Sequence, residues 1–180
     1  MFSLCLVSLL AWSFLIIVPF RPWSTREFFS PTSETQNIDL KDITVLIPAR
    51  NEEKHIEETL KCLSNQGCGH KIILVDDESS DRTSDKALGL GIKNLKLVNG
   101  LSPPEGWSGK VWALHQGFKE VSTPLVLLVD ADIKIEPRVL PNLLQKVREE
   151  DYDFVSIMAL LRTSTSWEKL LIPAFIYFFC

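Results

Sequence analysis

The sequence predicts an α/β fold with a mostly parallel sheet covered by helices on both faces, preceded by one transmembrane helix. Three observations support this. From Ile43 onward, short apolar runs alternate with segments of helical periodicity. The apolar runs contain almost no polar residues, which is typical of strands buried on both faces of a parallel sheet. The first twenty residues carry no charge, which is typical of a membrane span.

Four apolar runs are the main strand candidates, and a fifth follows the last expected helix. The first run, Ile43–Ile47, is expected to stop at Pro48. The others are Lys71–Val75, Leu95–Val98, Leu125–Val129 and Phe154–Met158. In a parallel sheet of this kind, ligands bind beyond the carboxyl ends of the strands, where the strand order switches. The residues that follow each strand are therefore the candidate site residues.

Helical segments are expected between these strands. Asn51 is expected to cap the first, with Glu52 and Glu53 in its first turn near the positive end of the helix dipole, and Gly67 is expected to end it. Its apolar face is expected from Ile56, Leu60 and Leu63. Further helices are expected over Thr83–Leu88, Lys110–Val121 and Pro141–Glu150.

The N-terminal segment, residues 1–20, is predicted to be a transmembrane signal-anchor. Twenty apolar residues in a helix span about 30 Å, the thickness of a bilayer core. A cleaved signal peptide is the alternative, but the segment lacks a basic start and a small-residue cleavage site. Arg21 and Arg26 follow the segment, so the positive-inside rule places the rest of the chain in the cytoplasm. Residues 21–42, rich in Ser, Thr, Pro and charge, are expected to be a linker.

Composition excludes several classes of protein. The net charge is −4 and no basic cluster stands out, so no nucleic-acid partner is expected. The four cysteines form no CxxC pair, and neither a zinc site nor a disulfide framework is expected.

The triplet Asp130-Ala131-Asp132, called the DxD triplet below, follows the fourth expected strand. Two carboxylates in this spacing can lie near one hard cation, and Mg²⁺ or Mn²⁺ prefers oxygen ligands and commonly retains water and phosphate oxygens. A nucleoside diphosphate leaving group needs such a charge as its bond to a sugar breaks. Alone, the triplet is a weak signal, because acidic residues after strands often only solvate a loop or cap a helix.

Two further polar clusters are expected at the same edge of the sheet. Pro48, Arg50 and Glu52 follow the first strand, and Asp76 and Asp77 follow the second. The acidic pair could accept hydrogen bonds from a base or a ribose hydroxyl. Three clusters at the carboxyl edge make a ligand site the favoured interpretation.

A loop before the fourth strand adds a basic residue. Gly109 allows close approach of the backbone, and Lys110 could meet a phosphate at a helix N-terminus. The alternative is an ordinary turn with a solvated lysine. Trp107 and Trp112 are candidates to line the same site, and core packing is the alternative role for Trp112.

These motifs resemble a known family. Ile43–Glu52, Val75–Thr83 and Val129–Asp132 resemble the three signatures of family 2 glycosyltransferases, and Gly106–Gly117 is similar to hopene-associated glycosyltransferases. The resemblance extends from Ile43 to about Trp167. It implies a GT-A fold, a Mg²⁺ or Mn²⁺ ion and a nucleotide-diphosphate sugar donor, with a UDP-sugar as the family default.

The resemblance also implies roles for individual residues. Asp77 is expected to contact the base or ribose, with Asp76 nearby, and Lys110 to assist at the phosphates. Asp130 and Asp132 are the expected metal ligands, and Asp130 alternatively faces the ribose. The residues expected to bind the nucleotide sugar are Pro48, Arg50, Glu52, Asp76, Asp77, Lys110 and Asp130.

The resemblance further implies inverting transfer, with a carboxylate base supplied after the DxD triplet. Glu149–Asp151 come too early to match that base, so it is expected beyond Cys180 and the chain is interpreted as truncated. Residues 43–167 are then the nucleotide-sugar-binding half-domain. Residues 168–180 are expected to begin a membrane-associated or acceptor region, with a buried amphipathic helix as the alternative. The predicted function is sugar transfer to a lipid-like acceptor, and the alternative is a nucleotide-sugar-binding module without turnover.

Overall fold

The computed structural model describes residues 2–17, 29–31, 38–159, 164–169 and 171–172. The chain divides into two compact units, Ser30–Ser156 and a second unit made of Met1–Phe29 with Ile157–Cys180. The first unit contains the sheet and helices α2 to α5, and the second contains α1 (Phe2–Ile17). The expected domain boundaries at residues 43 and 167 stay predictions. Most of the expected linker, and residues 173–180, lie outside the described residues.

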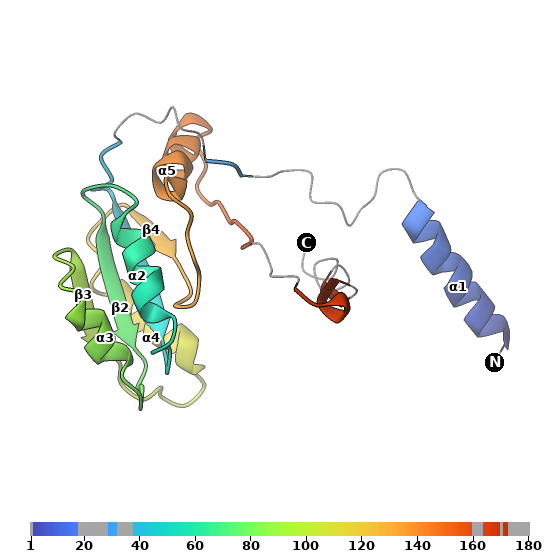
Figure 1. The fold of residues 1–180 in the computed structure, drawn as a ribbon, viewed down its shortest axis with the longest axis horizontal. Helices are drawn as coiled ribbons and strands as arrows, with labels where there is room; N and C mark the ends of the chain where they lie inside the picture. The colour runs from blue at the N-terminus through green and yellow to red at the C-terminus, as the bar shows by residue number, and fades with distance from the viewer. Residues whose placement is uncertain (1, 18–28, 32–37, 160–163, 170, 173–180) are drawn as a thin grey trace. The chain divides into compact units, whose positions relative to one another are not determined.

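A four-stranded parallel sheet forms the centre of the first unit (Figure 1). Its strands are β1 (Ile43–Ala49), β2 (Lys71–Asp76), β3 (Leu95–Asn99) and β4 (Leu125–Leu128). Their order is β3-β2-β1-β4, and Leu46 of β1 lies opposite both Ile73 of β2 and Leu128 of β4. The chain adds β2 and β3 on one side of β1 and then crosses to the other side for β4. The predicted parallel sheet is confirmed, and its strand order switches at β1 and β4.

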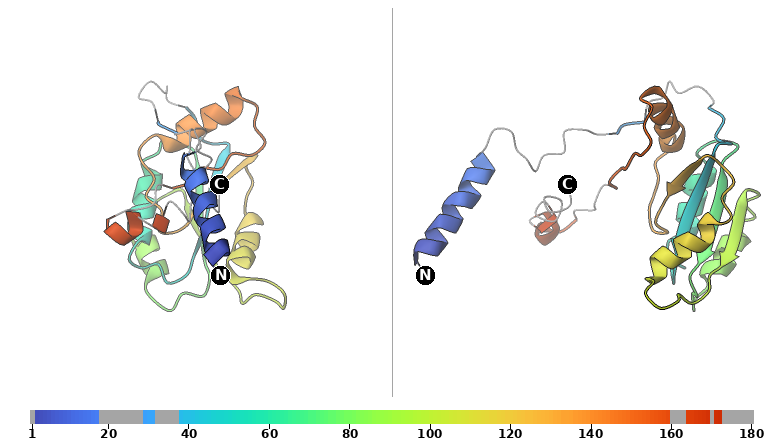
Figure 2. Two further views of the ribbon diagram at one scale, coloured as in Figure 1. Left: turned by 90° about the vertical axis from the view of Figure 1, so that its right-hand side faces the viewer. Right: turned by 180° about the vertical axis from the view of Figure 1, so that it is seen from behind.

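Helices cover both faces of this sheet, as predicted. Figures 1 and 2 show α4 on one face and α2 and α3 on the other. The bounds of the helices are Ile56–Ser64 for α2, Thr83–Gly89 for α3, Gly109–Phe118 for α4 and Val139–Glu149 for α5. Leu140 and Leu144 of α5 join the buried cluster on the α2 face.

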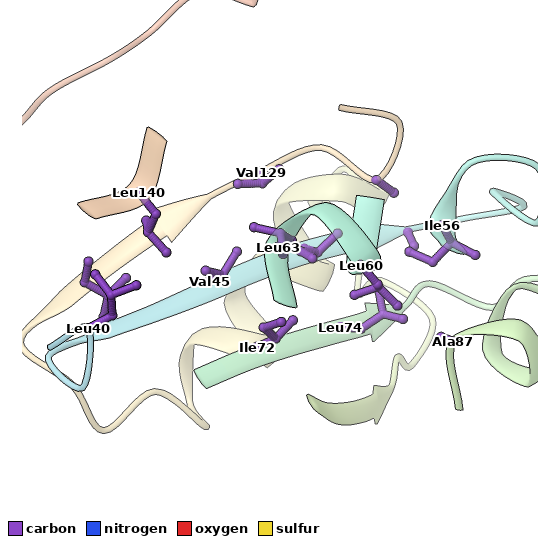
Figure 3. Close-up of a cluster of buried hydrophobic side chains, with 14 of the residues drawn as sticks. Leu40, Val45, Ile56, Leu60, Leu63, Ile72, Leu74, Ala87, Val129 and Leu140 are labelled. Carbon is purple, nitrogen blue, oxygen red and sulfur yellow. The ribbon is translucent and has the colours of Figure 1, made fainter. Parts of the chain in front are cut away.

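The two faces have separate apolar cores. Figure 3 shows Leu60 and Leu63 of α2 beside Val45, Ile72 and Leu74 of the sheet, all fully buried. The alternation of side chains along each strand sends the intervening residues to the α4 face. There, Ala113 of α4 packs with residues of β1 and β2.

Close packing on the α4 face depends on Gly117. A β-carbon at this position would collide with the side chains of Leu46 and Val75. The absence of a side chain therefore lets α4 lie directly on the sheet.

Several predicted element boundaries differ from the structure, and two of them have a clear physical cause. β1 continues through Pro48, because pairing with β4 ends at Leu46 and the proline lies where the strand has only β2 beside it. α2 starts at Ile56 and not after Asn51. Asn51 has φ 57°, and its side-chain oxygen accepts a hydrogen bond from the Ser80 N–H, so it ties two loops together and does not cap α2.

The expected fifth strand, Phe154–Met158, is also wrong. These residues form no strand, and Phe154 is 83% exposed. Their apolar composition suits a strand, but no described strand lies beside them to complete their hydrogen bonds.

The predicted membrane anchor is contradicted. α1 has sixteen residues, Phe2–Ile17, within the described part of the chain. Within the part of the chain that the structure describes, no helix is both long and apolar enough to cross a membrane. The cytoplasmic orientation, which was inferred from Arg21 and Arg26 beside that anchor, loses its basis as well.

Candidate functional site

A pocket of about 420 Å³ opens at the carboxyl ends of β1, β2 and β4. It lies where the strand order switches, as expected for this type of sheet. The residues that line it are Pro48, Ala49, Arg50, Glu52, Asp77, Gly109, Lys110, Asp130, Ala131 and Asp132. The structure therefore brings together all the expected site residues except Asp76. The individual roles of these residues stay predictions.

The side chain of Asp76 stabilises the turn after β2 and does not line the pocket. Its carboxylate accepts hydrogen bonds from the Ser79 N–H, at 2.9 Å, and from the Ser84 hydroxyl. These bonds hold the start of the loop that leads into α3. Asp76 thus supports the wall of the pocket from outside its lining.

Asp77 is the most unusual carboxylate of the pocket. It is 5% exposed, and its Oδ1 atom is buried without a hydrogen-bond partner among the described residues. Its Oδ2 atom lies 3.6 Å from Nη1 of Arg50, whose side chain is 60% exposed. A buried acceptor without a partner is costly, so such groups in native proteins usually serve a ligand, an ion or a water.

The loop after β1 is held against the loop after β2 by hydrogen bonds in both directions. The Asn51 N–H donates to Ser79 Oγ at 3.0 Å, and the Ser80 N–H donates back to Asn51 Oδ1 at 2.8 Å. The Glu52 N–H donates to Thr83 Oγ1 at 2.8 Å. These bonds fix the backbone of Glu52, so the side of the pocket formed by the loop after β1 is preorganised for a ligand.

The opposite side of the pocket carries the DxD triplet. Asp130 and Asp132 are exposed, whereas Ala131 between them is 4% exposed. The ammonium group of Lys110, in the first turn of α4, lies 2.6 Å from Asp130 Oδ1. Acidic and basic groups thus meet at this end of the pocket.

The two carboxylates of the triplet suit a hard cation that takes its remaining ligands from a substrate and from water. No group of three or more His, Cys, Asp or Glu residues capable of holding a metal occurs among the described residues. Two carboxylates leave most of an octahedral shell open, and Mg²⁺ and Mn²⁺ commonly fill it with water and phosphate oxygens. The residues present fit a cation that arrives with a diphosphate.

The aromatic residues near Lys110 do not line the pocket, contrary to one expectation. The rings of Trp107 and Trp112 meet edge to face with centroids 5.1 Å apart, and His115 stacks on Trp112 at 5.4 Å. The Trp112 indole N–H donates to the Leu101 carbonyl at 2.8 Å. This cluster packs the loop after β3 against α4.

The sequence pattern does not single out Thr59 or Gln66, although both contact the segment that carries the DxD triplet. Thr59 lies on the apolar face of α2, Gln66 lies two residues after the end of that helix, and both are buried. A polar residue on an apolar helix face is the signal that points to such a contact.

Comparison with known proteins places the fold and the motifs in context. A family model described as Glycosyl transferase family 2 matches residues 44–173. A dolichol-phosphate mannosyltransferase of Pyrococcus furiosus is 35% identical over 108 residues, which are 59% of this chain and 30% of that protein. A 4,4'-diaponeurosporenoate glycosyltransferase of Staphylococcus haemolyticus is 30% identical over 134 residues, 72% of this chain and 35% of that protein. The chain spans about a third of the length of these relatives.

Solved structures share the fold. The S. aureus TarS fragment in complex with UDP superposes with a TM-score of 0.53 at 28% identity, over 61% of this chain and 33% of that one. The mannosyltransferase PcManGT from Pyrobaculum calidifontis, in complex with GDP-Man and Mn²⁺, gives a TM-score of 0.51 at 23% identity over 71% of this chain and 37% of that one. The similarity of residues 106–117 to hopene-associated enzymes stays a prediction.

Proposed function

Because this chain belongs to glycosyl transferase family 2, we propose that its pocket holds the nucleoside diphosphate of a sugar donor. The observation that carries the proposal is Asp77, which lines the same pocket as the DxD triplet and whose buried Oδ1 atom has no partner in the described structure. One end of the pocket needs a hydrogen-bond donor, and the other end offers ligands for a cation. A nucleoside diphosphate has both chemistries.

At the first end, Asp77 would accept a hydrogen bond from an N–H of the base or from a ribose hydroxyl. Gly109 leaves space beside this carboxylate, because a β-carbon at residue 109 would lie 3.0 Å from Asp77 Oδ2. Arg50 and Glu52, on the preorganised loop after β1, complete this side.

At the second end, Asp130 and Asp132 would hold a Mg²⁺ or Mn²⁺ ion, and Lys110 would add its charge at the phosphates. When bound, the cation neutralises the diphosphate as the leaving group of sugar transfer. The complex of TarS with UDP supports a UDP-sugar as the first donor to test.

The acceptor is proposed to be lipid-like, with transfer by inversion. The support for the acceptor is the pair of relatives named for dolichol phosphate and for 4,4'-diaponeurosporenoate. The carboxylates of the pocket lining are all assigned to the donor and its cation, so none of them is proposed as the catalytic base.

Isothermal titration calorimetry of UDP, with and without Mn²⁺, tests the donor site. Wild type is expected to bind UDP more tightly with Mn²⁺, and Asp132→Ala is expected to lose that gain. Asp153→Ala, which removes an exposed carboxylate outside the pocket, is the matched control and should behave as wild type. Equal Mn²⁺-supported affinity in wild type and Asp132→Ala would refute the metal assignment. No binding of UDP or GDP would refute the donor site.

A nucleotide-sugar-binding module without turnover is the second candidate, favoured by the lack of an unassigned carboxylate in the pocket lining. An assay of sugar transfer to extracted lipids separates the two. Turnover by this chain, abolished in Asp132→Ala, would exclude the module.

A further inference from the structure

The segment that carries the DxD triplet is attached to α2 by a buried side chain. The hydroxyl of Thr59 donates a hydrogen bond to the carbonyl oxygen of Ala131 over 2.7 Å. Thr59 is 2% exposed and Ala131 is 4% exposed, so water does not compete for this bond. Thr59 itself does not line the pocket.

A second attachment lies farther along the same segment. The amide nitrogen of buried Gln66 donates to the Glu136 carbonyl at 2.9 Å, and its amide oxygen accepts from the Leu140 N–H at 3.1 Å. The backbone from Ala131 to Leu140 is therefore held at both ends by polar side chains from α2 and the turn after it.

The bond from Thr59 is specific to the triplet. A helical threonine hydroxyl can bond the carbonyl one turn earlier in its own helix, but this one reaches across to a different element. Its acceptor belongs to the peptide that joins Ala131 to Asp132, and a peptide group is planar. Fixing that carbonyl inward therefore fixes the orientation of the bond that leads to Asp132.

We propose that Thr59 is a positioning residue for the cation end of the pocket. Its hydroxyl holds the Ala131 carbonyl in the core, and so keeps Asp130 and Asp132 on the exposed side of the triplet. This inference rests on the proposed function, which assigns the triplet to a cation and a diphosphate. It adds a residue outside the pocket that sets the geometry of the cation end.

Thr44 provides a matched control for the loss of a buried hydroxyl. It is fully buried, and its hydroxyl pairs with that of Thr123 at 2.7 Å. It lies at the start of β1, whereas the pocket lies beyond the other end of that strand. Thr44→Val and Thr59→Val each replace one buried hydroxyl by a methyl group, but only the second contacts the triplet.

The test compares the full chain as wild type, Thr59→Val, Thr59→Ser and Thr44→Val. The first readout is amide hydrogen exchange without ligand in a peptide that begins at least two residues before Val129 and extends to Glu136. Two of its amides are hydrogen-bonded reporters, Val129 to the Leu46 carbonyl and Ile133 to the Asp130 carbonyl. The second readout is the Mn²⁺-supported affinity for UDP at a temperature where all variants are folded.

Thr59→Val is expected to exchange faster in this peptide and to weaken Mn²⁺-supported UDP binding about tenfold, the lower end of the loss caused by removing a group that orients metal ligands. Thr59→Ser keeps the hydroxyl and should restore both. Thr44→Val should lower thermal stability and change neither readout.

Two results would overturn the inference: exchange and affinity in Thr59→Val that match Thr44→Val, or a failure of Thr59→Ser to restore them. If wild type shows no Mn²⁺-supported binding of either UDP or GDP, the proposed function fails instead. The exchange data then still decide whether Thr59 holds the triplet.

Discussion

The ammonium group of Lys110 lies 2.6 Å from Oδ1 of Asp130, so the lysine that opens α4 occupies an oxygen expected to bind the cation. Both side chains are more than half exposed, at 60% and 55%. Exposed ion pairs contribute at most about 1 kcal/mol. A divalent cation can therefore displace the lysine, which is then available to a phosphate.

Lys110→Ala is expected to have opposite effects on the two ligands. Without nucleotide, Mn²⁺ should bind up to about fivefold more tightly, because the competing ammonium is gone. With Mn²⁺ present, UDP should bind about tenfold more weakly, because a charge-assisted contact to phosphate is lost. Electron paramagnetic resonance of free Mn²⁺ and calorimetry of UDP measure the two effects.

Lys93→Ala, which removes an exposed lysine outside the pocket, is the control and should change neither affinity. Weaker binding of Mn²⁺ alone in Lys110→Ala would contradict competition between lysine and cation.

Asp77→Asn is expected to separate stability from nucleotide binding. The substitution keeps the shape of the side chain and removes a buried charge whose Oδ1 atom has no partner in the described structure. Thermal stability should therefore be equal to or higher than that of wild type, while UDP affinity falls by about tenfold or more. Thermal melts and calorimetry test this. A large loss of stability with unchanged UDP affinity would indicate that Asp77 serves the fold alone.

Gly109→Ala is expected to narrow access to Asp77 without destabilising α4. The added β-carbon would lie 3.0 Å from Asp77 Oδ2 and 3.9 Å from Arg50 Nη1. Alanine favours a helix over glycine by up to about 1 kcal/mol, so the melting temperature should hold while UDP affinity falls. Gly89→Ala, where no atom lies within 4 Å of the new β-carbon, is the control and should leave UDP affinity unchanged. Unchanged affinity in Gly109→Ala would mean that the ligand does not approach Asp77 from this side.

The part of the pocket at the strand ends could be predicted from the sequence, because it depends only on local hydrophobic pattern and on the geometry of a parallel sheet. Apolar runs locate β2 and β4, and parallel strands bring Asp77 and Asp130 to the same edge. No knowledge of side-chain contacts is needed for that step.

Contacts between distant segments were beyond the sequence. Asparagine is a common helix-capping residue, but the side chain of Asn51 accepts a hydrogen bond from Ser80, and α2 begins only at Ile56. Likewise, Thr59 and Ala131 are 72 residues apart, and neither residue type predicts a hydrogen bond to the other. Such bonds depend on the packed arrangement of α2 over the sheet, which local propensity does not contain.

His70 is expected to make the stability of the fold depend on pH. Its side chain is 1% exposed, and neither ring nitrogen has a hydrogen-bond partner among the described residues. Burial is the largest cause and lowers the pKa of His70 below its ordinary value of 6.5. The nearby Leu63 backbone opposes that shift in part, although its contact with the ring does not meet hydrogen-bond geometry. The folded protein therefore keeps His70 neutral at a pH where the unfolded chain takes up a proton.

The sign of the effect follows from this difference in protons bound. Below about pH 6.5 the unfolded state binds more protons, so the free energy of unfolding falls as the pH falls, until the folded pKa is reached. One histidine contributes a slope of at most about 1.4 kcal/mol per pH unit. Urea unfolding of wild type and His70→Phe between pH 7.5 and pH 5 measures it, and the variant should show a flatter profile. His55→Gln removes an exposed histidine and should keep the wild-type slope. An equal slope in wild type and His70→Phe would show that other groups cause the acid sensitivity.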